Sequence, residues 1–151
     1  MAEQAGSRGA LTSVTASWGE GRPAARVLLV GYGSAGRGIH APLLTAAGAA
    51  PSVVVSSHPE RVAQVRADLP GTEVVATLDD ALTGAAASGV RFDLAVIASP
   101  SGVHAANALA CIAAGVPVVV DKPLAVDARS AAQVVEAAAA AEVPLTVFQN
   151  R

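Results

Sequence analysis

A short apolar run that opens directly into a glycine loop constrains this chain more than any other feature. Residues 26–36 read RVLLVGYGSAG, so a strand-like segment leads straight into the pattern G-x-G-x-x-G. This order predicts a buried strand, a tight turn at Gly31 and a helix that begins near Ser34. Gly33 leaves room for a phosphate to approach the backbone, and Gly36 lets the helix pack closely on the strand. The first N–H groups of the helix and the positive end of its dipole are then available to hold an anion.

The loop is therefore the first candidate site for a dinucleotide, through the residues Gly31, Tyr32, Gly33, Ser34, Ala35 and Gly36. A glycine triplet by itself is also typical of simple turns in an alanine-rich chain. The strand-like run before the loop and the helix-forming residues after it favour the dinucleotide interpretation.

Composition fits an α/β core and argues against several classes of function. Hydrophobic residues make up 52% of the 151 residues but aromatic residues only 3%, so the core must be built from Val, Leu, Ile and Ala. Such residues suit helices packed on a parallel sheet. A net charge of −2 with scattered basic residues predicts neither nucleic acid nor an anionic membrane as a partner. No apolar run reaches the roughly 18 residues of a membrane span, and no metal site is expected.

The single cysteine and the amino-terminal segment bear on the cellular compartment. Cys111 has no partner for an intrachain disulfide, and its alanine-rich surroundings predict a small buried hydrophobe rather than a catalytic thiol. Residues 1–9 lack the basic start and apolar stretch of a signal peptide. These observations predict a cytoplasmic protein with a flexible tail at 1–25 and one domain at 26–151.

From residue 26 onward, strand signals alternate with helix signals. Strands are expected at 27–30, 52–56, 74–76, 92–98, 116–120 and 144–148. This alternation predicts an α/β fold, a Rossmann-like doubly wound parallel sheet of about six strands in a single domain.

Local features shape the helices expected between these strands. Pro42 is expected to break the first helix near residues 40 and 41, because its ring clashes with the preceding turn. Thr77 and Asp127 are expected to begin helices. The buried stripes of the last two helices are expected at Val103, Ala106, Leu109, Ala110 and Ala113, and at Ala131, Val134, Val135 and Ala138.

The end of the second expected strand bears on the choice of cofactor. Ligands of such sheets bind beyond the carboxyl ends of the strands, where an acidic residue usually holds the ribose 2′-hydroxyl of NAD. Here the acid is absent, and the segment carries Ser56, Ser57, His58 and Arg61. Small hydroxyls and a nearby arginine accept a 2′-phosphate, which favours NADP over NAD. The alternative interpretation of Arg61 is a solvated helix residue.

Three segments together resemble one known family. Residues 36–43 (GRGIHAPL), 93–104 (DLAVIASPSGVH) and 113–124 (AAGVPVVVDKPL) are similar, in this order, to the glucose–fructose oxidoreductase / inositol dehydrogenase / MocA (Gfo/Idh/MocA) family. The resemblance covers residues 26–151. It implies an NAD(P)-dependent oxidoreductase that acts on a sugar, a polyol or a related hydroxy or carbonyl compound.

The resemblance also implies roles for residues at two further strand ends. Lys122 matches the family's catalytic lysine beside the nicotinamide, and a lysine at a strand end is suited to act as a general acid or base. Asp121 stands where the family usually has Glu, and the peptide bond from Lys122 to Pro123 is expected to be cis. The turn that packs against the cofactor falls on Ser99, Pro100, Ser101 and His104, with Ser101 in place of a frequent Asn. For His104, hydrogen bonding within the turn and contact with the cofactor remain equally open.

Members of this family continue into a second domain that supplies most of the substrate pocket and the oligomer interface. The resemblance therefore implies a cofactor-binding half whose substrate domain is absent, with little or no turnover alone and with a small-molecule substrate and a possible homo-oligomer in the full-length protein. The alternative is a stand-alone NAD(P)-binding sensor or a non-catalytic partner subunit. A CoA-binding domain is a more distant possibility, against which the acid-Lys-Pro segment argues.

Overall fold

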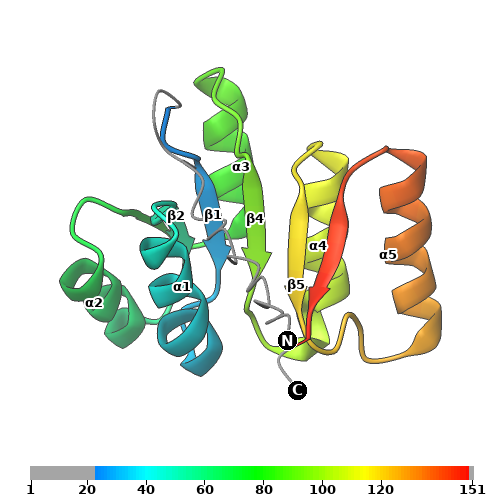
Figure 1. The fold of residues 1–151 in the computed structure, drawn as a ribbon, viewed down its shortest axis with the longest axis horizontal. Helices are drawn as coiled ribbons and strands as arrows, with labels where there is room; N and C mark the ends of the chain where they lie inside the picture. The colour runs from blue at the N-terminus through cyan, green and yellow to red at the C-terminus, as the bar shows by residue number, and fades with distance from the viewer. Residues whose placement is uncertain (1–22, 150–151) are drawn as a thin grey trace, which may run out of the picture.

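The computed structural model describes residues 23–149, and they form one parallel sheet covered by helices on both faces (Figure 1). The expectations for residues before 23 and for Asn150 and Arg151 lie outside the described residues. The strands run in the order β3-β2-β1-β4-β5-β6, and every neighbouring pair is parallel. Their bounds are β1 Val27–Val30, β2 Pro51–Val55, β3 Glu73–Val75, β4 Leu94–Ile97, β5 Val118–Asp121 and β6 Leu145–Phe148. The predicted doubly wound sheet of six strands is confirmed.

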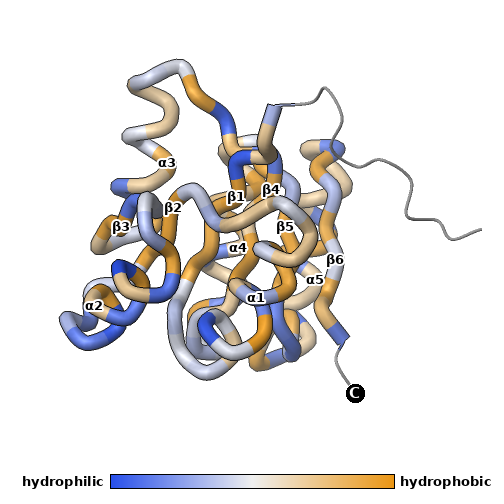
Figure 2. The backbone as a smooth tube through the Cα atoms, turned by 60° about the vertical axis from the view of Figure 1, so that its left-hand side comes forward, coloured by the Kyte–Doolittle hydropathy of each residue, from blue (hydrophilic) through white to orange (hydrophobic). Residues whose placement is uncertain are grey.

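The helices divide between the two faces of the sheet. One core contains residues of α1 (Ala41–Ala46) and α2 (Pro59–Asp68), and the other contains residues of α3 (Leu78–Ala87), α4 (His104–Ala113) and α5 (Ala128–Ala140). Strand β1 contributes alternate residues to the two cores and is at most 3% exposed throughout. Figure 2 shows the same layering as hydrophobic strands at the centre. Full burial explains why the β1 sequence is an unbroken apolar run.

Side-chain caps fix the beginnings of α3 and α5, as the sequence predicted. The Thr77 hydroxyl accepts a hydrogen bond of 3.1 Å from the Asp80 N–H, while the Asp80 carboxylate accepts one of 3.2 Å from the Thr77 N–H. The Asp127 carboxylate accepts a hydrogen bond of 2.8 Å from the Ser130 N–H. Hydrogen bonds from Ser130 hold the pKa of Asp127 below its usual value. These caps satisfy N–H groups that have no partner within the helix.

The prediction of a break near His40 was wrong. The chain passes from the helical residues after Gly33 through a π-helical turn, η1 (Gly36–His40), directly into α1. The Ala41 N–H donates to the Gly36 carbonyl, five residues earlier, so the wider turn keeps the backbone hydrogen-bonded. Pro42 then occupies the second position of α1, within the first turn, where proline is tolerated.

The buried face of α4 differs from the prediction in phase, whereas that of α5 differs at one residue. In α4 the buried residues are His104, Ala108, Cys111 and Ile112, whereas Val103 is 45% exposed. In α5 Val134 and Ala138 are buried as predicted, but Val135 is exposed. Because alanine occupies both faces of α4, its sequence indicates the helical period but not which face meets the sheet.

The interpretation of Cys111 as a small core hydrophobe agrees with the structure. Its side chain is fully buried in α4, and this burial raises the pKa of the thiol to about 12.

Among the described residues, no helix is both long and apolar enough to cross a membrane.

Candidate functional site

The glycine loop lies at the carboxyl end of β1, and two of its glycines are required by the chain itself. Gly31 has a φ of +97°, and a Cβ there would lie 2.7 Å from the Ala98 carbonyl oxygen. A Cβ at Gly36 would overlap the Gly31 carbonyl oxygen. At Gly33, by contrast, the nearest atom would be Cζ of Arg61 at 3.8 Å, which is an ordinary contact. The fold therefore does not need a glycine at position 33.

One pocket brings the loop together with the ends of β4 and β5. It has a volume of about 250 Å³, and each predicted site residue at these three strand ends contributes to it except Tyr32 and Gly36. Its predicted members are Gly31, Gly33, Ser34, Ala35, Ser99, Pro100, Ser101, His104, Asp121 and Lys122, and Arg61 reaches in from α2. Gly36 is buried and acts through its close packing on Gly31.

A second pocket of about 250 Å³ lies on the other side of the loop, beside β2. It is lined by Ser56, Ser57 and His58, the three residues that directly follow this strand, and by Arg61. Arg61 thus borders both pockets and lies above Gly33. These four residues line the second pocket together with Gly31 and Tyr32 of the loop.

His104 joins the ends of β4 and β5. Its side chain is buried, with Nε2 2.7 Å from the Ser99 carbonyl oxygen and Nδ1 2.7 Å from the Pro123 carbonyl oxygen. Carbonyl oxygens only accept, so a singly protonated ring donates to one of them and a doubly protonated ring donates to both. Of the two roles left open for this residue, the structure shows the hydrogen-bonding one.

The Lys122–Pro123 peptide bond is cis, as the family resemblance implied.

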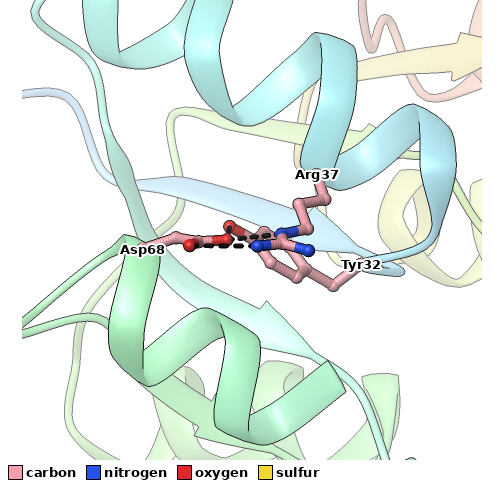
Figure 3. Close-up of polar contacts among 3 residues, drawn as sticks. All are labelled: Tyr32, Arg37 and Asp68. Atoms are coloured by element: carbon pink, nitrogen blue, oxygen red, sulfur yellow. Dashed lines mark hydrogen bonds and ion pairs between the residues drawn. The ribbon is translucent and has the colours of Figure 1, made fainter. Parts of the chain in front are cut away.

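The Tyr32 side chain lies in a polar cluster with Arg37 and Asp68 (Figure 3), and Tyr32 also lines the pocket beside β2. Its hydroxyl donates to Asp68 Oδ2 at 3.2 Å, and Arg37 donates to the same carboxylate at 2.6 and 3.3 Å. The Arg37 guanidinium lowers the pKa of Asp68, while burial and the Asp68 carboxylate raise the pKa of Tyr32 to about 12. Asp68 is the last residue of α2, so the cluster ties the glycine loop and the helix after it to α2.

We expect the phenol of Tyr32, the only tyrosine of the chain, to titrate near pH 12 in an absorbance measurement of the folded protein. The folded-state pKa lies above the unfolded value of about 10. The contribution of Tyr32 to stability is therefore complete below about pH 10 and is lost as the pH rises through its folded-state pKa.

Asp68→Asn removes the neighbouring anion and should move this midpoint toward about 10. Circular dichroism at each pH establishes that the chain is still folded. A midpoint near 10 in the folded wild-type protein would contradict the buried, carboxylate-paired phenol.

Sequence reasoning missed several polar residues near the pockets. Asn107 lines the pocket beside β2 and donates to the Ser99 hydroxyl at 3.0 Å. The pairs Arg37–Asp68 and His40–Asp121 each join segments that are distant in the sequence. Asn107 was detectable as a polar residue one turn after His104 on α4, but local spacing carries no signal for the two pairs.

Fold and site together define the class of protein. An open parallel sheet whose first strand ends in a glycine loop, with polar side chains gathered at the carboxyl ends of β2, β4 and β5, is the architecture of a dinucleotide-binding Rossmann domain. Comparison with known proteins supplies the family. Residues 25–149 match the Gfo/Idh/MocA model, described as the oxidoreductase family with the NAD-binding Rossmann fold, and the chain belongs to this family.

Individual relatives agree with this membership. The chain is 33% identical over 127 residues to scyllo-inositol 2-dehydrogenase (NADP(+)) IolW of Bacillus subtilis, a match that covers 83% of this chain and 33% of the relative. Among solved structures, GenD2 from gentamicin A biosynthesis in complex with NAD has a TM-score of 0.71 at 34% identity, covering 82% of this chain and 34% of that one.

The WlbA dehydrogenase of Bordetella pertussis, in complex with NADH and UDP-GlcNAcA, has a TM-score of 0.72 at 28% identity, covering 83% of this chain and 35% of that one. The chain thus spans about one third of the length of the relatives that it matches.

Proposed function

We propose that this chain is the cofactor-binding half of an NAD(P)-dependent oxidoreductase that moves a hydride to or from a sugar, a polyol or a related hydroxy or carbonyl compound. One observation carries the proposal. Gly31 and Gly36 face backbone atoms of the chain, whereas a Cβ at Gly33 would meet no described atom closer than 3.8 Å. A pyrophosphate needs this space to reach the N–H groups of the loop. Family membership and the relatives named as dehydrogenases support the same function.

Lys122 is the residue that we propose for the proton transfer. It directly follows β5 and lines the pocket that contains Gly33 and Asp121. When bound there, the nicotinamide ring of the cofactor donates or accepts the hydride. As hydride leaves the substrate carbon, the Lys122 amine takes the proton of the substrate hydroxyl. In the reverse direction the Lys122 ammonium returns that proton to the carbonyl oxygen.

For the cofactor we propose NADP in preference to NAD. The segment after β2 offers the hydroxyls of Ser56 and Ser57 and contains no carboxylate before Glu60. Arg61 borders the pocket beside this segment, and among residues 23–149 it has no carboxylate within salt-bridge distance. A guanidinium without a carboxylate is well suited to a 2′-phosphate. The relatives differ in cofactor, since the name of IolW specifies NADP(+) and the structure of GenD2 contains NAD.

We expect NADPH to bind more tightly than NADH in a fluorescence titration. Arg61→Gln should lower the affinity for NADPH by about tenfold or more, because a hydrogen bond to a charged group contributes roughly 1.5–3 kcal/mol, and should leave the affinity for NADH nearly unchanged. Arg66→Gln is the matched control, since Arg66 is an exposed arginine of the same helix that lines neither pocket. Equal affinities for the two cofactors in the wild-type chain would refute the preference for NADP. A variant at Arg61 with unchanged discrimination would refute the role of this side chain.

A further inference from the structure

Two buried polar side chains face each other behind the β5 end of the pocket. His40, in η1, is 4% exposed, and Asp121, the last residue of β5, is 9% exposed. His40 Nε2 lies 3.5 Å from Asp121 Oδ1, and neither atom has a hydrogen-bonding partner among residues 23–149. A charge-assisted hydrogen bond is shorter, at about 2.7–2.9 Å. Buried polar atoms are almost always satisfied, so this pair calls for an explanation in terms of function.

The surroundings of His40 fix the direction in which its ring faces. The ring packs edge-on against Phe148, with 4.8 Å between centroids and 66° between planes. Phe148 is in turn the register partner of Asp121 across the β5–β6 ladder. The imidazole therefore lies against Phe148 and Asp121, which are paired with each other across the sheet. The π-helical turn that follows the glycine loop carries His40 to this place. A ring held in this way can influence the orientation of the Asp121 side chain, although His40 itself does not line the pocket.

Asp121 connects this pair to the cofactor pocket. Asp121 lines the first pocket together with Gly33 and Lys122. The second pocket, which contains Ser56 and Ser57, lies on the other side of the loop. A dinucleotide whose phosphates lie on the loop, with its adenosine half beside β2, extends its nicotinamide half toward β5. The carboxylate of Asp121 is thus on the nicotinamide side of the site.

We propose that His40 is a positioning residue that orients the Asp121 carboxylate, and with it the turn at Lys122, for the nicotinamide half of the cofactor. This inference rests on the proposed dinucleotide-binding function. A carboxylate removed from water needs a donor or a positive charge close to it, and among the described residues His40 Nε2 is the group that faces Oδ1. Without His40 Nε2, which lies 3.5 Å from Oδ1, the carboxylate is free to turn toward the pocket or toward solvent, and it no longer presents one fixed arrangement to the ligand.

The test compares a ligand that has the nicotinamide with one that lacks it. We expect His40→Leu to weaken the binding of NADPH by about tenfold, because the variant leaves a buried carboxylate oxygen with no polar atom facing it. Binding of 2′-phosphoadenosine 5′-diphosphoribose, which lacks the nicotinamide, should change less than twofold. His40→Gln keeps an amide N–H donor and should retain most of the affinity for NADPH. Leu43→Gln is the control, because Leu43 is an exposed residue of α1 close in sequence to His40.

Each other outcome would overturn a distinct part of this proposal. Equal losses for both ligands in His40→Leu would mean that His40 supports the fold rather than the nicotinamide side. Full NADPH affinity in His40→Leu, or no recovery in His40→Gln relative to His40→Leu, would refute the proposed role of His40 in orienting Asp121. A wild-type chain that binds neither ligand would refute the dinucleotide-binding function itself, and the inference about His40 with it.

Discussion

Gly33→Val should reduce the affinity for NADPH by a hundredfold or more while leaving the stability of the fold unchanged. The structure has space for the new side chain, because the nearest atoms belong to the flexible end of Arg61 at 3.8 Å. A phosphate needs the same space to reach the N–H groups of the loop. Losing two such hydrogen bonds to a charged group, at roughly 1.5–3 kcal/mol each, corresponds to at least a hundredfold weaker binding.

Two measurements on the same variant separate binding from folding. Fluorescence titration gives the affinity for NADPH, and thermal unfolding followed by circular dichroism gives the stability. Gly84→Val provides the matched control, since Gly84 lies in α3 with nothing within 4 Å of its added Cβ and lines neither pocket. Unchanged affinity in Gly33→Val would refute the phosphate site at the loop. Lost affinity together with a large loss of stability would mean that the fold itself requires a glycine at position 33.

Much of the fold could be predicted because the strands are short, apolar and bounded by residues that end them. The segment 27–30 is the clearest example, since it is predicted and observed with the same limits. The phase of α4 could not be predicted, because alanines lie on every side of the helix and only tertiary contacts select His104 and Cys111 as buried. The effect of Pro42 was also misjudged, since a π-helical turn keeps the backbone hydrogen-bonded where a regular α-helix would break.

The candidate site was predictable to the extent that it depends on topology. In a parallel sheet the carboxyl ends of all strands meet at one edge, so polar residues after β1, β2, β4 and β5 had to gather there. The contacts that fix their orientation were not predictable. His104 bridges two of the strand ends, and His40 faces Asp121 only because the turn after the loop passes over β5 and β6. Such contacts join residues far apart in the chain, and no local spacing reveals them.

Gly36→Ala should have the opposite profile to Gly33→Val and should destabilise the fold itself. The added methyl group would overlap the Gly31 carbonyl oxygen and lie 3.0 Å from the Gly31 carbonyl carbon, and both are backbone atoms. Neither can rotate away, so the helix must move from the strand. Overpacking of this kind costs typically 1–3 kcal/mol, and we expect about 3 kcal/mol here because backbone meets backbone.

Chemical unfolding followed by circular dichroism measures this loss, with Gly38→Ala as the control. Gly38 lies two residues further along η1 with nothing within 4 Å of an added Cβ, so this variant should gain roughly 0.5–1 kcal/mol. Because the Gly36 methyl also displaces the loop, NADPH binding should fall with stability, whereas at Gly33 binding falls alone. A Gly36→Ala variant as stable as the wild-type chain would mean that the close approach of helix and strand is not required. Variants at Gly33, Gly36 and Gly38 thus separate the glycine that ligand binding requires from the glycine that the fold requires.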